Sequence, residues 1–543
     1  MRIDWLKIGK VAESQDTLLS LMAAEDEPRP STGFKNLQDF EIDFDQDQLT
    51  TVLIGRNGSG KSNLIEAIVL IFRDLDLGEK SQFAYAIKYQ CRGNEIIVEA
   101  NPERKTGHTQ ITINGRRVTQ SAFRENRREY LPQHVFAYYS GPSNRLETHF
   151  NKHQKEFYDA LLEDNELPLR PLFYARMIHG FFVLLAYFSF DDQQTREILE
   201  EHLGIVGLES VLFVLREPDW AKGKKNERAR AGGDPRFWYA KGVVSRFLND
   251  LYAASLAPIL TTESYTPAFN KKPISEERLF LFVKDQAKIA ELASTYKNNI
   301  NFFKMLESTY ISDLIREVRV RVQKKGVDES LTFTELSEGE QQLLTVLGLL
   351  KFTNESESLF LLDEPDTHLN PRWKYDYLSL LEKGVGKQSS SHLIISTHDP
   401  LLIGGLERTQ VQILEVADHK VISRPPAEDP RTQSVEGLLK SELFDLPTTV
   451  FPEAQGKLNR RDELFAKEER TPEEDAEMRQ LSNELAEMGF AKTFRDPMYE
   501  QFVKAMARRE EFKRPDLTPE ELKKQDEIAN AVLDEILAEE EAE

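Results

Sequence analysis

Apolar runs of strand length recur along the chain, and three of them are followed at once by polar residues. Val52–Ile54 leads into a glycine-rich stretch, after which apolar residues return at helical spacing over residues 63–68. The runs at 359–362 and 393–395 end in an acidic pair and in Ser-Thr-His-Asp, respectively. Because strand patterns alternate here with helical ones, the spacing predicts an α/β fold whose strands end in functional groups.

Two further patterns predict elements between these strands. Residues 318–322 alternate strictly between valine and arginine, which predicts a half-exposed strand that returns the chain to the core. Residues 180–190 are apolar and carry no charge. A run of about eleven residues cannot cross a bilayer, which needs about twenty, so a buried helix is expected. Nothing at the N-terminus resembles a signal peptide, and a soluble, cytoplasmic protein is predicted.

The glycine-rich stretch, residues 55–62, reads Gly-Arg-Asn-Gly-Ser-Gly-Lys-Ser. It has the spacing of a phosphate-binding loop, with the strand before it and the helix after it that such a loop requires. Its glycines let backbone N–H groups turn toward a phosphate, and the helix N-terminus favours negative charge. Lys61 is predicted to reach the β- and γ-phosphates of ATP, and Ser62 to bind Mg²⁺. The residues predicted to bind ATP here are Gly55, Asn57, Gly58, Ser59, Gly60, Lys61, Ser62 and Asn63.

The acidic pair Asp363-Glu364 supplies the second half of the predicted site. A carboxylate that ends a strand beside a phosphate loop can hold Mg²⁺, so Asp363 is the predicted metal ligand together with Ser62. Glu364 is then placed to orient and deprotonate the attacking water as general base. His398, at the end of the next apolar run, suits a sensor of the γ-phosphate.

The segment 336–342, Leu-Ser-Glu-Gly-Glu-Gln-Gln, has the pattern of a helix start. Ser337 is the predicted N-cap and Glu340 stands three residues on, as in a capping box. The hydroxyl and the free N–H groups at such a start can bind an anion. Many helices begin this way, so the segment indicates a nucleotide site only in combination with its position upstream of Asp363.

The order of phosphate loop, LSEGE segment, strand-Asp-Glu and strand-Ser-Thr-His-Asp resembles the ATP-binding-cassette (ABC) ATPases, in particular the branch of the SMC and RecF proteins. The resemblance implies a head that sandwiches two ATP molecules in a head-to-tail homodimer, or in a higher homo-oligomer. Ser337 and Gly339 would then contact the γ-phosphate in the partner's site, and residues 366–368 would cross between subunits. The family's glutamine is assigned to Gln133, just before the apolar run 135–139.

The chain departs from this family within the LSEGE segment. Glu338 stands where the family has glycine, and Glu340 where it often has glutamine. An additional carboxylate near a triphosphate repels it. The resemblance therefore implies an ATPase whose turnover is slow.

The chain has 543 residues, too many for one hydrophobic core. Frequent prolines between Lys61 and Leu336 exclude the long coiled-coil arms of SMC proteins, because proline breaks helices. A compact, mostly helical insertion is expected instead. The predicted domains are 1–150, the N-terminal ATPase lobe with the phosphate loop; 151–300, the inserted helical domain; 301–425, the ATPase lobe with the LSEGE segment; and 426–543, a C-terminal helical extension.

Charge is unevenly distributed along the chain. The net charge of −22 argues against a surface given over to nucleic acid, although the basic segment 222–236 is a candidate contact. Residues 516–543 carry a net charge of −9. Two Thr-Pro-Glu-Glu sequences, at Thr471 and Thr518, predict the starts of amphipathic helices. These helices either cover their own domain or dock a partner.

No metal-dependent nuclease is indicated after His398. That stretch has no Asp-x-Asp pair, as a Toprim nuclease requires, and only His419 toward a His-Asn-His site. The single cysteine, Cys91, excludes a disulfide framework and a cysteine-rich zinc site. A self-sufficient nuclease of the overcoming-lysogenization-defect type is therefore the least favoured interpretation.

Within the ABC group, such a chain most resembles the PtuA ATPases of Septu-type antiphage systems, including those encoded with retrons. The resemblance implies a regulatory ATPase of a defence complex with a partner HNH nuclease similar to PtuB. In retron versions it also implies a reverse transcriptase and its RNA–DNA product, msDNA. The alternative is a RecF-like repair ATPase, which tight, salt-sensitive DNA binding by the isolated chain would favour.

Overall fold

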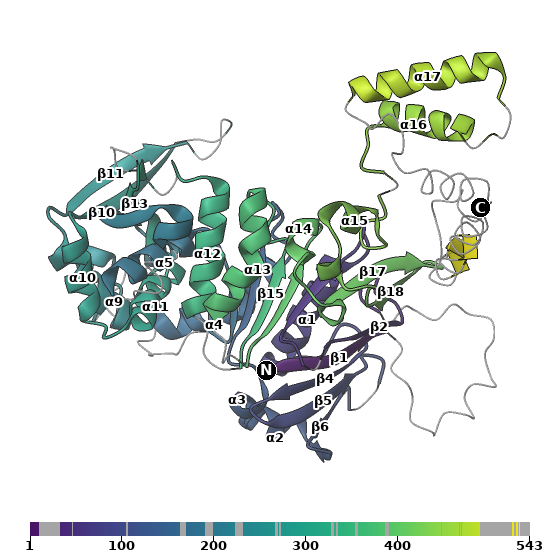
Figure 1. Cartoon of the computed structure of the whole chain (residues 1–543). Coiled ribbons are helices and arrows are strands. Elements are labelled where there is room, and N and C mark those ends of the chain that lie inside the picture. The colour runs from purple at the N-terminus through teal and green to yellow at the C-terminus, as the bar shows by residue number, and fades with distance from the viewer. Residues whose placement is uncertain are drawn as a thin grey trace. The chain divides into compact units, whose positions relative to one another are not determined.

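The computed structural model describes residues 1–9 and 33–488, with short internal gaps, and a few positions between 524 and 532. Backbone contacts divide the chain into two compact units, Met1–Pro426 and Ala427–Glu543. All of the predicted site residues lie in the first unit (Figure 1). The gaps are at residues 46, 105–106, 163–169, 191–198, 223–231, 267–269, 271–272, 327–330, 333–334, 353–356, 386–389, 447, 466 and 468–469.

A seven-stranded sheet holds the three predicted strands, in the order β18-β17-β3-β16-β15-β8-β9. All neighbours are parallel except β17 and β18. Since parallel strands end at one edge, the residues that follow β3, β8, β15 and β16 come together there. The bounds are β3 Thr50–Ile54, β8 Val135–Tyr139, β9 Leu172–Tyr174, β15 Leu359–Asp363, β16 His392–Ser396, β17 Val411–Ala417 and β18 Lys420–Arg424.

Helix α1, Lys61–Leu77, follows β3 and is buried along most of its length. It shares one hydrophobic core with the seven-stranded sheet and with an antiparallel six-stranded sheet of order β2-β1-β4-β5-β6-β7 (Figure 1). The middle of the helix, residues 64–72, is apolar at every position except Glu66, and such a segment must be enclosed in this way. The bounds are β1 Arg2–Ile8, β2 Phe40–Asp43, β4 Tyr85–Cys91, β5 Asn94–Ala100, β6 Thr109–Ile113, β7 Arg116–Val118, α2 Gln120–Glu125 and α3 Arg127–Tyr130.

The region between β8 and β15 combines helices with a third sheet, of order β11-β12-β10-β13-β14. Helices are abundant there, as predicted, but this antiparallel sheet is an addition that the sequence analysis missed. The alternating run 318–322 is a strand, within β13, whose burial also alternates. The bounds are α4 Asn151–Leu162, α5 Ile178–Ser189, β10 Ile205–Arg216, α7 Asp219–Lys222, α9 Gly242–Ala254, β11 Ile259–Tyr265, β12 Ile274–Val283, α10 Gln286–Ser294, α11 Asn299–Ile311, β13 Ile315–Lys324, β14 Leu331–Thr332 and α12 Glu338–Phe352.

Strand β13 pairs with β10 in this third sheet, not with the parallel sheet. The predicted strand is confirmed, but it belongs to this third sheet, and the chain re-enters the parallel sheet only at β15. Conversely, β9 lies within residues 151–300 and pairs with β8 of the parallel sheet. The inserted region is thus joined to the ATPase sheet by a strand of its own.

Helix α5 is the uncharged apolar run, and the structure confirms that it is buried. It packs against α12, where Gly348 allows a close approach because an added Cβ would lie 2.1 Å from Val183. No helix among the described residues is long and apolar enough to cross a membrane.

A buried ionic cluster lies between the helices of this region and β9. Arg170, just before β9, pairs through Nη2 with Glu307 of α11 at 2.5 Å, and Nε2 of His179 on α5 lies 2.9 Å from the same carboxylate. All three side chains are at most 5% exposed. Burial alone would raise the pKa of Glu307, but His179 and Arg170 hold it below its ordinary value. The carboxylate is therefore ionised and depends on both partners.

The remaining helices of the first unit follow the strands of the parallel sheet. Helix α13, Pro371–Val385, comes after β15, and the short α14, Pro400–Ile403, after β16. Asp399 caps α14 by accepting a hydrogen bond from the N–H of Leu401, and it pairs with Lys374 of α13 at 2.6 Å. These contacts anchor the chain directly after His398.

The second unit is helical where it is described. It contains α15, Val435–Lys440, and a hairpin of α16, Pro452–Phe465, and α17, Pro472–Glu487. The helix start predicted at Thr471 is confirmed, because its hydroxyl accepts from the N–H of Glu474 and its own N–H donates to that side chain. The start predicted at Thr518 and the acidic stretch 516–543 lie outside the described residues, apart from isolated positions.

Candidate nucleotide-binding site

The phosphate loop connects β3 to α1 through backbone conformations that suit glycine. Gly55 has a φ of 151° and Gly60 a φ of 104°. A Cβ on Gly55 would lie 2.1 Å from the carbonyl oxygen of Leu414 on β17. The loop can therefore curl only with glycine at that position. Ser59 is 3% exposed and its hydroxyl has no hydrogen-bond partner within the described part of the chain.

Lys61 folds back over this loop. Its Nζ donates to the carbonyl oxygen of Gly55 at 2.6 Å, and the residue is 6% exposed. Burial lowers the pKa of Lys61, while the charges of Glu364 and Asp363 act in the opposite direction. The ammonium therefore lies close to both the curled loop and the acidic pair. A triphosphate bound by the loop would form an ion pair with it.

Asp363 and Ser62 meet although they are 301 residues apart in the chain. The Ser62 hydroxyl donates to Oδ1 of Asp363 at 3.0 Å, and the Ser396 hydroxyl donates to the same oxygen. Burial raises the pKa of Asp363, which is 2% exposed, against these two hydrogen bonds. A buried carboxylate beside a hydroxyl is a ligand pair that Mg²⁺ accepts together with phosphate oxygens.

Glu364 adopts a left-handed backbone conformation, with a φ of 52°. Its N–H is 3.1 Å from both the carbonyl and the hydroxyl oxygen of Ser396, so hydrogen bonds hold this strained residue in place. Nδ1 of His398 lies 3.3 Å from Oε1 of Glu364. The side chain of Glu364 is 30% exposed and that of His398 is 54% exposed, so both are open to water. The structure thus brings together the predicted base and the predicted γ-phosphate sensor.

The LSEGE segment forms the expected capping box at the start of α12. The Ser337 hydroxyl accepts from the N–H of Glu340, and the Ser337 N–H donates to the Glu340 carboxylate at 2.8 Å. Lys324 of β13 also pairs with Glu340. Burial would raise the pKa of Glu340, but the hydrogen bonds from Lys324 and Ser337 lower it. The unusual Glu340 is therefore engaged within its own subunit.

Gly339 makes the closest approach between α12 and the loop after β15. An added Cβ would lie 2.5 Å from the carbonyl oxygen of His368. Glu338 reaches the same loop, with 3.1 Å between its carboxylate and Nδ1 of His368, and Gln342 accepts from the His368 N–H. Ser337 and Glu338 are thus exposed next to Thr367 and His368, while Gly339 and Asp366 are buried. Among the described residues, the hydrogen bonds of Ser337 go to Glu340 and Gln341 and none goes to the phosphate loop of the same chain.

Gly339→Ala is expected to disturb this surface. The methyl group must displace the backbone at His368 or the start of α12, and overpacking of this kind costs about 1–3 kcal/mol. Urea denaturation should show that loss, whereas Gly405→Ala, at a glycine with open space around it, should show little. Equal stability of the two variants would contradict the close approach.

Gln133 is not brought to this site. It precedes β8 and so lies at the amino end of that strand, whereas the phosphate loop and Asp363 lie at the carboxyl ends. Its Oε1 accepts from Arg92, and its N–H donates to the carbonyl of Glu357. The assignment of Gln133 as a nucleotide ligand is corrected accordingly.

Other residues at the start of α1 were missed by the sequence analysis. Asn36 donates to the carbonyl of Gly58 at 3.1 Å and accepts from Asn63 at 2.7 Å, so it braces the phosphate loop. Lys35 and Arg145 both contact Glu66, one turn after Ser62. These residues lie outside the phosphate-loop motif, and no sequence pattern around them predicts a contact with it.

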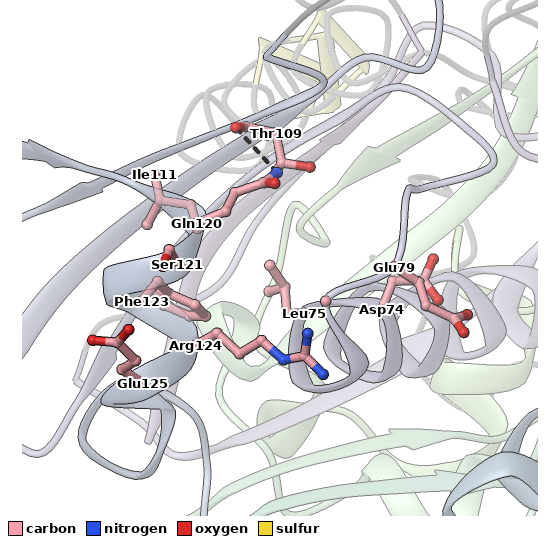
Figure 2. A pocket seen from close by; sticks show the side chains of 11 residues that line it. Asp74, Leu75, Glu79, Thr109, Ile111, Gln120, Ser121, Phe123, Arg124 and Glu125 are labelled. Carbon is pink, nitrogen blue, oxygen red and sulfur yellow. Dashed lines mark hydrogen bonds between the residues drawn. The ribbon is translucent and has the colours of Figure 1, made fainter.

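A cavity of about 490 Å³ lies at the other end of α1, bounded by Asp74, Phe123 and Arg124 (Figure 2). Asp74 is thirteen residues beyond Lys61, which corresponds to about 20 Å along a helix. The cavity is therefore separate from the phosphate loop. The described residues contain no group of three or more histidine, cysteine or acidic side chains that could hold a metal ion by themselves.

Comparison with known proteins places ATPase domains on both halves of this site. Residues 32–163 match a family model described as "AAA ATPase domain". Residues 206–404 match one described as "AAA domain, putative AbiEii toxin, Type IV TA system". Together the two matches include the phosphate loop, the LSEGE segment and the acidic pair.

Two curated proteins are similar to parts of the chain. Septu protein PtuA of Bacillus mycoides (strain KBAB4) is 28% identical over 166 residues, which are 28% of this chain and 22% of that protein. The Retron Vc95 probable ATPase of Vibrio cholerae serotype O1 biovar El Tor is 26% identical over 167 residues, 29% of this chain and 30% of the relative. The predicted resemblance to PtuA is confirmed. The chain matches less than a third of the length of either relative.

Solved SMC head domains are also similar at low identity. The head domain from Thermotoga maritima has a TM-score of 0.32 and 13% identity, and covers 78% of this chain and 99% of its own. A head domain with an extended coiled coil, bound to the C-terminal domain of ScpA and derived from Pyrococcus furiosus, has a TM-score of 0.31 and 16% identity, with 78% and 97% covered.

Proposed function

We propose that this chain is the Mg²⁺-dependent, ATP-hydrolysing regulatory subunit of an antiphage defence complex. The single observation that carries the ATPase assignment is the contact of Ser62 with Asp363 at 3.0 Å. It unites the phosphate-loop hydroxyl with the acidic strand end, which are the two halves of a nucleotide–metal site. The similarity to PtuA and to a retron ATPase supports the role in defence.

Each side chain then has a defined task. Lys61 and the loop backbone bind and orient the phosphates, and Ser62 and Asp363 would hold the metal ion. When bound, Mg²⁺ neutralises charge on the phosphate oxygens. Glu364 takes a proton from the attacking water, and His398, 3.3 Å from it, orients that carboxylate and meets the γ-phosphate.

The second half of each site would come from another copy of the chain. Ser337 and Glu338 are exposed on a surface shared with Thr367 and His368, and Gly339 packs against the backbone of His368. We propose that this surface closes over the nucleotide of a partner in a homodimer or a higher homo-oligomer. Glu338, which is largely exposed on it, would repel the triphosphate and slow turnover.

The output of the ATPase cycle is proposed to be control of a partner HNH nuclease similar to PtuB. In a retron setting, a reverse transcriptase and msDNA would join the complex. The basic segment 222–236 is proposed to contact nucleic acid. Most of it, residues 223–231, lies outside the described part of the chain. Arg236 is already paired with Asp234 at 2.7 Å, so it is a weaker candidate than the other basic residues of this segment.

Paired variants test the composite site. Lys61→Ala and Ser337→Arg should each be inactive alone, because one removes the phosphate-loop charge and the other blocks the opposite surface. Co-expressed with different tags, they form heterodimers in which one of two sites is intact, so up to about half of wild-type ATPase activity should return in the doubly tagged species. ATP hydrolysis by the doubly tagged species is the measurement.

The matched control is Lys61→Ala with Glu364→Gln. Both changes lie on the same half-site, so every site of that heterodimer carries a defect and no activity should return. Recovery in neither mixture would reject the head-to-tail arrangement and indicate that each chain holds a complete site. Recovery in both would contradict the assignment of Lys61 and Glu364 to the same half-site.

A further inference from the structure

The loop after β8 leaves the parallel sheet beside the proposed metal ligand. Tyr139, the last residue of β8, is in register with Asp363, and the N–H of Ser140 donates to the Asp363 carbonyl at 3.3 Å. The hydroxyl of Ser140 also lies 3.0 Å from that of Thr367. This loop therefore delivers its side chains to the edge of the sheet where the phosphate loop and the acidic pair meet.

Arg145, in this loop, reaches back to the start of α1. Its Nη2 lies 3.2 Å from Oδ1 of Asn63 and 3.3 Å from Oε2 of Glu66. Both contacts use the same nitrogen, and the side chain is 34% exposed. No contact of Nε or Nη1 occurs within the described residues, so most of the donors of the guanidinium are available for another acceptor.

Positive charge exceeds negative charge around Glu66. Its buried carboxylate lies 2.5 Å from Nζ of Lys35, 3.0 Å from Nε2 of His149 and 3.3 Å from Arg145. Burial would raise the pKa of Glu66, but the hydrogen bonds from His149 and Lys35 and the charges of Lys35 and Arg145 lower it. One carboxylate thus faces two permanent cations, and Arg145 is the most distant of its partners.

An anion at the phosphate loop would offer Arg145 a better partner. A guanidinium binds phosphate through two parallel hydrogen bonds, which its present single-nitrogen contacts do not provide. Lys35 and His149 would still neutralise Glu66 after Arg145 had moved. Asn63, which Arg145 already contacts, follows Ser62 of the phosphate loop directly, so the guanidinium lies next to the proposed nucleotide site.

We propose that Arg145 binds the γ-phosphate of ATP held on its own chain, and that Glu66 and Asn63 hold it ready when no nucleotide is bound. This inference rests on the proposed ATPase function. It assigns discrimination between ATP and ADP to a residue of the same subunit, because ADP lacks the group that Arg145 contacts. The same contact stabilises negative charge on the phosphoryl group during transfer.

The test compares ATP and ADP binding by the full chain in the presence of Mg²⁺, using isothermal titration calorimetry. Arg145→Ala should weaken ATP binding about tenfold or more, as expected for loss of a charged hydrogen bond. ADP binding should be nearly unchanged, and Arg145→Lys should restore part of the ATP affinity. The ratio of the two affinities is a readout that a merely structural role would not move.

Two matched variants complete the experiment. Arg127→Ala removes an exposed arginine that pairs with Asp76 near the far end of α1, and it should leave both affinities unchanged. Glu66→Gln releases Arg145 from its present partner and should leave the preference for ATP intact or increase it. Thermal unfolding without nucleotide separates loss of fold from loss of binding.

The outcomes separate this inference from the proposed function. Wild-type protein that binds neither nucleotide would overturn both. Wild-type protein that prefers ATP, with the same preference in folded Arg145→Ala, would overturn only the role of Arg145. Equal destabilisation by Arg145→Ala and Glu66→Gln, with unchanged ATP preference, would make the pair a structural ion pair.

Discussion

Lys61→Ala is expected to reduce ATP affinity about 100-fold, or about 2.7 kcal/mol. The ammonium is nearly buried between the curled phosphate loop and two carboxylates, and its present acceptor is the carbonyl of Gly55. Without it, the negative charges of Asp363 and Glu364 would face the triphosphate with less compensation. A hydrogen bond to a charged group contributes about 1.5–3 kcal/mol, which matches the expected loss.

The measurement is calorimetric titration with ATP and Mg²⁺, after thermal unfolding has shown that the variant is folded. Lys152→Ala is a suitable control, because that lysine is exposed and pairs with Glu79 near the opposite end of α1. Wild-type ATP affinity in folded Lys61→Ala protein would remove Lys61 from the nucleotide site. A similar loss in Lys152→Ala would point to a general electrostatic effect.

Glu364→Gln is expected to lower ATP turnover by about 10²–10⁴-fold while ATP affinity is retained. The amide keeps the shape of the side chain but cannot accept the proton of the attacking water. Its backbone should stay in place, because the hydrogen bonds to Ser396 involve the N–H of residue 364 and not its side chain. Slow hydrolysis should also leave the ATP-bound dimer long-lived, so light scattering should detect more dimer with ATP than in the wild type.

The matched control is Glu415→Gln on β17, another carboxylate-to-amide change at a residue that pairs with Arg424. It should leave turnover unaffected. If Glu364→Gln protein hydrolyses ATP at the wild-type rate, the general base must be sought elsewhere. If the variant also loses ATP affinity, Glu364 contributes to ATP binding, and a role as general base alone does not explain its effect.

The parts of the site that were predicted from sequence are those in which the functional residues and a clear strand or helix pattern occur in adjacent positions. The phosphate loop, the strand before Asp363 and the helix start at Ser337 each combine a spacing with an apolar or capping pattern in adjacent residues. Their meeting in space follows from parallel pairing, which places Asp363 opposite Ser396. Local patterns and this single topological rule account for most of the predicted site.

The failures concern contacts between segments that are distant in sequence. Gln133 was chosen for its closeness to an apolar strand, but it lies before that strand, and parallel strands place functional groups after their carboxyl ends. That rule would have directed attention to Arg145 instead. The third sheet was missed because β10 is buried on both faces in places, so its pattern does not alternate and its partners are non-local.

The buried cluster of Arg170, Glu307 and His179 also limits how this architecture can be recombined. Arg170 precedes a strand of the ATPase sheet, whereas its carboxylate partner comes from a helix more than a hundred residues later. A chimaera that exchanged the region from α5 to α11 without matching Arg170 would leave a charge buried and unpaired, at a cost of about 3–5 kcal/mol. An exchange of this region therefore has to supply a carboxylate for Arg170 or replace the arginine at the same time.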